Sequence, residues 1–199
     1  MTSGELAALL SDLLSIPLST VDLYGRKLRA AGLLSVKGHG RGAAQMTPDD
    51  AAAWLVALCI DHKRGGDFVA EVRQVLDLPL CNTLALPETF AEGLGASDTN
   101  YLGDALAALI RDTPAPRFAK AMAKRQDVII LNFHAEGDCV GISIRNKKLG
   151  SDFKAVSWTF QHGNIDDRQR LNLERVTALN GIVLFEIARA MQLIPPPPY

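Results

Sequence analysis

Residues able to bind phosphate gather in one stretch near the start of the chain. Between positions 16 and 45 five basic residues stand against the single acid Asp22, although the 199-residue chain carries a formal net charge of only −1. The basic residues are Arg26, Lys27, Arg29, Lys37 and Arg41. A local basic patch in a nearly neutral chain is typical of an anion-binding site. The other interpretation is a solvated, purely structural helix and hairpin.

The run GHGRG, residues 38–42, is the most unusual part of this stretch. It lacks the G-x-G-x-x-G spacing of a dinucleotide loop, and no Lys-Ser/Thr pair follows a glycine as in a P-loop. A dinucleotide loop also leads straight into a helix, whereas residues 43–46 intervene here. We therefore expect the run to be the tip of a hairpin rather than a nucleotide cradle.

Metal binding and nucleophilic catalysis have little support in the residue pattern. Cys59 and His62 are three positions apart on an expected helix, but a structural zinc site needs two more ligands. The remaining candidates have no paired spacing; they are Cys81, His134, Cys139 and His162. No G-x-S-x-G elbow or Cys-His signature is present. We expect no metal, no cofactor and no enzymatic activity.

The elements that must position the basic residues follow from local signals. A first helix is expected over Glu5–Leu14, and Pro17 interrupts it. The next runs over Thr20–Ala31, with Ser19 and Asp22 as a capping box and Gly32 as its left-handed stop. A third helix begins after Thr47, with Pro48 at its first position. A two-stranded hairpin over residues 33–46 fits the length of chain between the second and third expected helices.

Helix, tight break, basic helix, hairpin and helix is the order found in a winged helix-turn-helix. The stretch LSTVDLYGRKLRAAGLLSVKGHGRGAAQMT, residues 18–47, resembles the recognition helix and wing of winged-helix transcription regulators. It is also similar to regulators carried by prophages and gene transfer agents of alphaproteobacteria. The resemblance covers about a sixth of the chain.

This resemblance implies binding to double-stranded DNA. The recognition helix, residues 19–31, would lie in the major groove, and the wing, residues 33–46, on the flanking backbone or minor groove. The helix residues expected at the DNA are Ser19, Thr20, Leu23, Arg26, Lys27 and Arg29. Those of the wing are Lys37, His39 and Arg41, and Asp22 must be capped or contact a base donor.

The rest of the chain predicts an α+β protein with a mostly helical N-terminal part. Helices are expected over 67–76 and 100–111, with a loop and a short helix over 79–97. Three antiparallel strands, 127–136, 139–146 and 154–161, would be backed by one long helix over 166–193. The expected units are a DNA-binding domain (1–65), a helical connector (66–126), an α+β interaction domain (127–194) and a proline-rich tail (195–199).

Composition and partners complete the expectations. Three widely spaced cysteines among apolar residues fit a reducing cytoplasm, and no apolar run reaches membrane-spanning length. The C-terminal module would form a homodimer, or else contact another regulatory protein or RNA polymerase. The near-neutral charge keeps a second function open: an interaction or structural protein of a phage-like element whose winged helix binds protein.

Overall fold

The protein is described from a computed structural model. The described residues are 1–36, 45–60, 62, 65–84, 101–112, 127–134, 139–146, 156–161, 176–180 and 182–191. Six helices lie in these ranges: α1 (Ser3–Leu14), α2 (Leu18–Ala30), α3 (Pro48–Cys59), α4 (Phe68–Leu76), α6 (Leu102–Asp112) and α8 (Ile182–Ala190). Five strands accompany them: β1 (Leu80–Leu84), β2 (Asp127–His134), β3 (Cys139–Asn146), β4 (Val156–Gln161) and β5 (Val176–Asn180).

Local capping signals determine where α3 begins. Thr47 accepts a hydrogen bond from the backbone N–H of Asp50, the Asp50 carboxylate accepts one from the N–H of Thr47, and Pro48 is the first helical residue. The same reciprocal arrangement joins Thr2 and Glu5 at the start of α1. Each box satisfies two amides that have no partner inside the helix.

The start of α2 differs from the expectation. The helix begins at Leu18, and its N-cap is Pro17, which has no side-chain cap hydrogen bond. Ser19 therefore lies inside the first turn, and the expected capping box of Ser19 and Asp22 is wrong. Pro17 is already close to helical φ, at −53°, and its carbonyl accepts from the N–H groups of Thr20 and Val21. The C-terminal stop at Gly32 is confirmed by its φ of +72°.

The sheet overturns the expected three-stranded architecture. Its order is β1-β4-β3-β2-β5, and every neighbouring pair is antiparallel. β2, β3 and β4 lie on the three expected runs, but β1 adds a strand beside β4 and β5 adds one beside β2. β1 lies where a loop and a short helix were expected.

The prediction of one long helix over 166–193 is also wrong. Residues 176–180 form β5, in which Leu179 is paired with Leu131 of β2, and the helix that follows, α8, spans only Ile182–Ala190. An apolar stripe at helical spacing does not exclude a strand when a sheet edge can accept its backbone hydrogen bonds. Here the open edge of β2, distant in sequence, decides the conformation.

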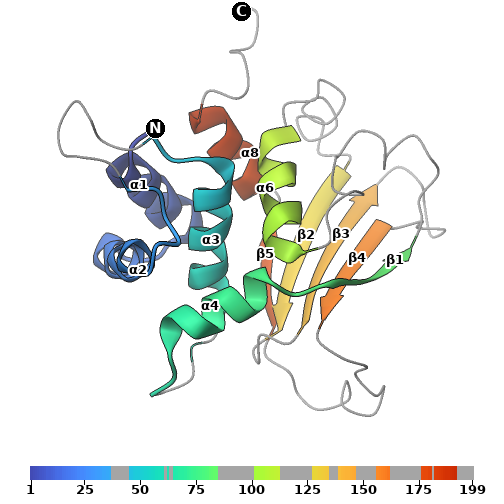
Figure 1. Ribbon diagram of the computed structural model, residues 1–199. Helices are drawn as coiled ribbons and strands as arrows, with labels where there is room; N and C mark the ends of the chain where they lie inside the picture. The colour runs from blue at the N-terminus through green and yellow to red at the C-terminus, as the bar shows by residue number, and fades with distance from the viewer. Residues whose placement is uncertain are drawn as a thin grey trace, which may run out of the picture.

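The helices and the sheet lie side by side, with α1 and α2 at the end away from the sheet (Figure 1). α3 packs against α2, α4 and α6, and α6 packs against α8. One hydrophobic core unites them: it contains residues of all six described helices and Val140 of β3. α2 packs against both α1 and α3, and part of its surface is exposed. The expected division of the chain into four units stays a prediction.

Candidate nucleic-acid interface

The turn between α1 and α2 is three residues long and locally hydrogen-bonded. Ser15 adopts the left-handed conformation, with φ 55° and ψ 37°, and ends α1. The N–H of Ile16 donates to the carbonyl of Ser11, whose hydroxyl donates to the carbonyl of Ile16 at 2.7 Å. Short turns of this kind join two helices both in αα-hairpins and in helix-turn-helix motifs. The turn therefore holds α2 at a defined angle to α1.

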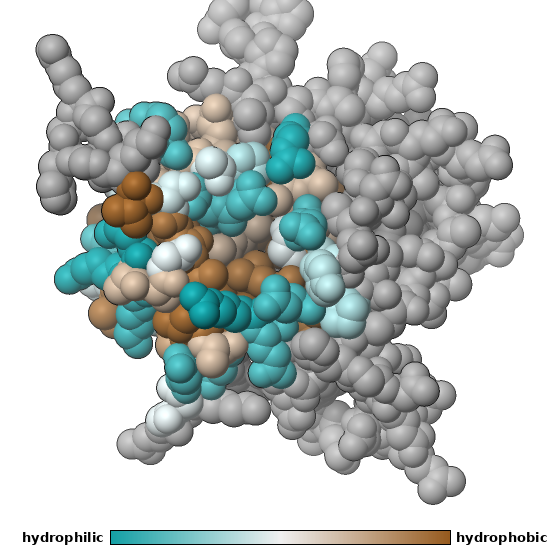
Figure 2. Space-filling model, viewed as in Figure 1, coloured by the Kyte–Doolittle hydropathy of each residue, from teal (hydrophilic) through white to brown (hydrophobic). Residues whose placement is uncertain are grey.

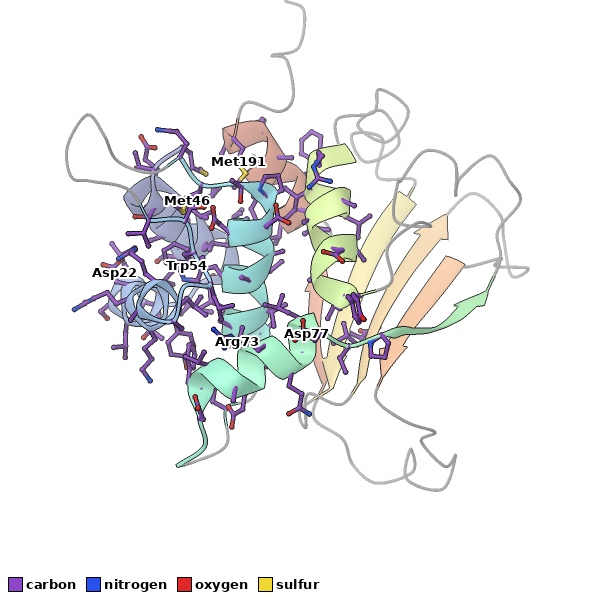
Figure 3. All side chains as sticks on the ribbon, in the orientation of Figure 1. Asp22, Met46, Trp54, Arg73, Asp77 and Met191 are labelled. Atoms are coloured by element: carbon purple, nitrogen blue, oxygen red, sulfur yellow. The ribbon has the colours of Figure 1, made fainter. Side chains whose placement is uncertain are left out.

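The inner face of α2 is held by Trp54 of α3. Val21, Gly25 and Leu28 are buried on this face, and the indole Nε1–H of Trp54 donates to the carbonyl of Val21 at 3.2 Å. In Figure 3, Trp54 lies between α2 and α3, whereas Asp22 lies on the side of α2 that faces away. Because the inner face is buried, the rotation of α2 about its own axis is determined.

The opposite side of α2 carries a stripe that we call the outer face: Ser19, Leu23, Arg26 and Ala30. Its members are spaced four, three and four residues apart, so they share one side of the helix, and all four are exposed. The side of the molecule on which α2 lies shows polar and apolar residues intermixed (Figure 2). The outer face combines a hydroxyl, a large apolar group and a guanidinium.

The structure separates the expected helix residues into three groups. Ser19, Leu23 and Arg26 come together on the outer face, and Thr20 is half-buried beside it. The ammonium Nζ of Lys27 lies 4.9 Å from the centre of the Phe68 ring, a cation–π contact with α4. The third group is Arg29 alone: it is half-buried, and its Nη2 donates to the hydroxyl of Ser3 in α1 at 3.3 Å.

The expected wing lies largely outside the described residues. Lys37, His39 and Arg41 belong to the undescribed segment 37–44. On either side of it, residues 33–36 and 45–47 are described and contain no strand.

Asp50 of α3 holds together the described residues on the two sides of this segment. The side chain is 4% exposed. Its Oδ1 accepts from the N–H of Ser35 at 2.6 Å, and its Oδ2 accepts from the N–H and the hydroxyl of Thr47 at 2.7 and 2.9 Å. One carboxylate thus connects the chain before residues 37–44 to the chain after them.

His62 has a structural environment that the sequence did not indicate. Its ring lies against Tyr24 of α2 and Phe68 of α4, with centroid distances of 5.2 and 4.5 Å. Its Nε2 lies 2.8 Å from the carbonyl oxygen of Ala57, and its Nδ1 lies 3.0 Å from Oε2 of Glu71. Both partners are acceptors, so both bonds form only when both ring nitrogens carry hydrogen. The cluster joins α2, α3 and α4.

Cys59, the other residue of that pair, lies in the hydrophobic core. Cys59 is buried, and this burial raises the pKa of its thiol to about 12. In the part of the chain that the structure describes, no three His, Cys, Asp or Glu side chains come together as a metal-binding group.

Arg73 of α4 stabilises the end of α2. Its Nη2 donates to the carbonyl of Ala31 at 2.9 Å, immediately after the last residue of the helix. A guanidinium at a helix C-terminus satisfies a free carbonyl and interacts favourably with the helix dipole. No local pattern relates Arg73 to Ala31, because the two meet only through the packing of α4.

Comparison with known proteins adds no relative. No family model, no curated protein and no solved structure matches the chain. Within the described ranges, no helix is both long and apolar enough to cross a membrane.

Proposed function

We propose that the protein is a sequence-specific, double-stranded-DNA-binding transcription regulator, in which α2 enters the major groove. The observation that carries this proposal is the outer face of α2. Its rotation is determined by Trp54 and by the turn after α1, and it leaves Ser19, Leu23 and Arg26 exposed together. A helix held by its neighbours with one polar side free has the geometry that major-groove recognition requires.

The charges around α2 support a polyanionic ligand. Arg26 and Lys27 are exposed, and Arg73 adds a third cationic side chain near the C-terminal end of the helix. Asp22 is the acid beside them, half-buried on the solvent side. Arginine on a recognition helix binds guanine edges or phosphates, both of which present acceptors. Lys37, His39 and Arg41 stay a prediction as additional contacts to the flanking DNA.

DNA selection followed by affinity measurement tests this function. The full chain is used to select duplexes from a random pool, and affinities for the selected DNA are measured by fluorescence anisotropy at several salt concentrations. Arg26→Ala should weaken binding by about 1–3 kcal/mol, because a base or phosphate contact is lost. Arg189→Ala is the control: Arg189 is an exposed arginine on α8 that pairs with Glu186 at 3.5 Å. The affinity of the Arg189→Ala variant for the selected DNA should stay within twofold of the wild type.

Two results would contradict the proposal. One is failure to enrich any duplex; the other is equal affinity of the wild type and Arg26→Ala.

The second candidate function, binding of a protein through the same helix, is favoured by the exposed apolar side chains Leu18, Leu23 and Val36. A protein partner that is lost in Leu23→Ala, with no DNA enriched, would support it. A homodimer matching two DNA half-sites is part of the proposal and is checked by analytical ultracentrifugation.

A further inference from the structure

Leu23 departs from the amphipathic pattern of α2. The other branched aliphatic residues of the helix interior, Val21 and Leu28, are fully buried, but Leu23 is 47% exposed. It lies at the centre of the outer face, four residues after Ser19 and three before Arg26. Leu23 is not needed to attach α2 to the core, because the buried face of the helix against Trp54 already does this.

Leu23 lies outside the hydrophobic core of the described part of the chain. The half-buried apolar residues that pack against the core include Tyr24, Leu33 and Phe68, but not Leu23. Isolated exposed apolar residues are common on protein surfaces. Here, however, the residue stands on the face where Ser19 and Arg26 are also free, so a ligand on that face must contact it.

The neighbouring charges indicate the ligand. Arg26 lies one helical turn from Leu23, and Lys27 is exposed beside it, which favours an anionic partner. Among the groups exposed in the major groove, the C5 methyl of thymine is the apolar one, whereas the groups around it are hydrogen-bond donors and acceptors. A leucine between a serine and an arginine matches a methyl group between polar base edges.

We infer that Leu23 contacts a thymine methyl group and makes the protein prefer thymine at that position of its DNA site. This inference rests on the proposed function, because it needs α2 to lie in the major groove. Arg26, one turn further along, binds a base edge or phosphate on the same side. Leu23 therefore determines specificity, whereas Arg26 supplies much of the affinity.

Replacing thymine by deoxyuridine tests the contact, because uracil lacks only the methyl group. Each thymine of the selected duplex is replaced in turn, and affinity is measured at constant salt with the full chain. At one position, loss of the methyl group should weaken wild-type binding by about fourfold, the value for one buried methyl-sized group. Leu23→Ala should bind thymine and uracil duplexes equally well at that position.

Leu18→Ala is the matched control. Leu18 is also 47% exposed, but it lies at the first residue of α2, off the stripe of the outer face. This variant should keep the preference for thymine over uracil. Circular dichroism and thermal melting of both variants verify that α2 is intact.

The outcomes separate the inference from the proposed function. If no duplex is enriched, the proposed function fails, and the inference with it. If DNA binds but no uracil substitution changes affinity, or the preference persists in Leu23→Ala, the inference is overturned and DNA binding stands. If Leu23→Ala instead lowers the sedimentation coefficient and leaves the thymine preference intact, Leu23 contacts a second copy of the chain, which also overturns the inference.

Discussion

Gly25 of α2 lies directly against the indole ring of Trp54 of α3. A Cβ built on Gly25 would be 2.7 Å from Cη2 and 2.9 Å from Cε2 of the ring, closer than real Cβ atoms approach. The glycine is therefore needed for the close approach of two helices, not for a turn. The same indole donates a hydrogen bond to the carbonyl of Val21, one turn earlier in α2.

Gly25→Ala should destabilise the protein, although alanine favours a helix by about 1 kcal/mol over glycine. The added methyl group meets a rigid, buried ring, and such overpacking costs about 1–3 kcal/mol. Urea unfolding followed by tryptophan fluorescence measures the free energy of unfolding. Gly4→Ala in α1 is the control, because nothing lies within 4 Å of a Cβ built there. It should be neutral or stabilising; equal or greater stability of Gly25→Ala would contradict the close contact.

Asp50→Ala should be strongly destabilising. It leaves the amides of Ser35 and Thr47 without their acceptor, and each lost hydrogen bond to a charged group costs about 1.5–3 kcal/mol. Thermal melting and hydrogen exchange at the two amides measure the effect.

Asp49→Ala is the matched control for Asp50. Asp49 is the adjacent acid in the same turn of α3, and it is exposed, with a distant pair to Arg111 at 3.9 Å. Its removal should change stability by at most about 1 kcal/mol, as for surface ion pairs in general. Equal effects of the two substitutions would show that Asp50 does not hold the chain on either side of residues 37–44.

Cys59 should be inert in the folded protein and should make stability depend on alkaline pH. Its pKa is raised from 9.0 to about 12 by burial, so the folded state keeps a proton that the unfolded state loses. Between pH 9 and 12 the unfolded state therefore binds fewer protons, and this contribution to stability falls as pH rises. Below pH 9 the contribution is fully present.

Two measurements check the behaviour of Cys59. Iodoacetamide labelling at pH 8, followed by peptide mass spectrometry, should modify Cys59 only as fast as the protein unfolds. Stability measured between pH 8 and 10.5 should fall less steeply in Cys59→Ala than in the wild type, whatever their difference at pH 8. Rapid labelling of Cys59 under native conditions would show that the thiol is accessible.

Some helix boundaries could be predicted because their causes are local. Thr47 and Pro48 begin α3 through hydrogen bonds and a φ angle that involve only neighbouring residues, and Gly32 ends α2 because glycine tolerates positive φ. α4 could be expected from Asp67 and the apolar spacing that follows it, and the structure confirms it at Phe68–Leu76.

The role of each candidate residue on α2 could not be predicted in this way. Ser19, Leu23 and Arg26 share the outer face, but Arg29 bonds to Ser3, and Lys27 lies over Phe68. These differences arise because α1 and α4 pack on either side of α2. Residue type alone does not distinguish a basic side chain that is free from one that has a partner within the fold.

The sequence by itself determined the helix signals and the basic character of the N-terminal part, since both depend on residue type and short spacing. Only the tertiary structure decided the two edge strands of the sheet and the candidate interface. β1 and β5 are strands because the backbones of β4 and β2 offer them hydrogen bonds across long stretches of chain. Likewise, Gly25 acquires its role from Trp54, and the outer face exists because that contact determines which side of α2 is buried.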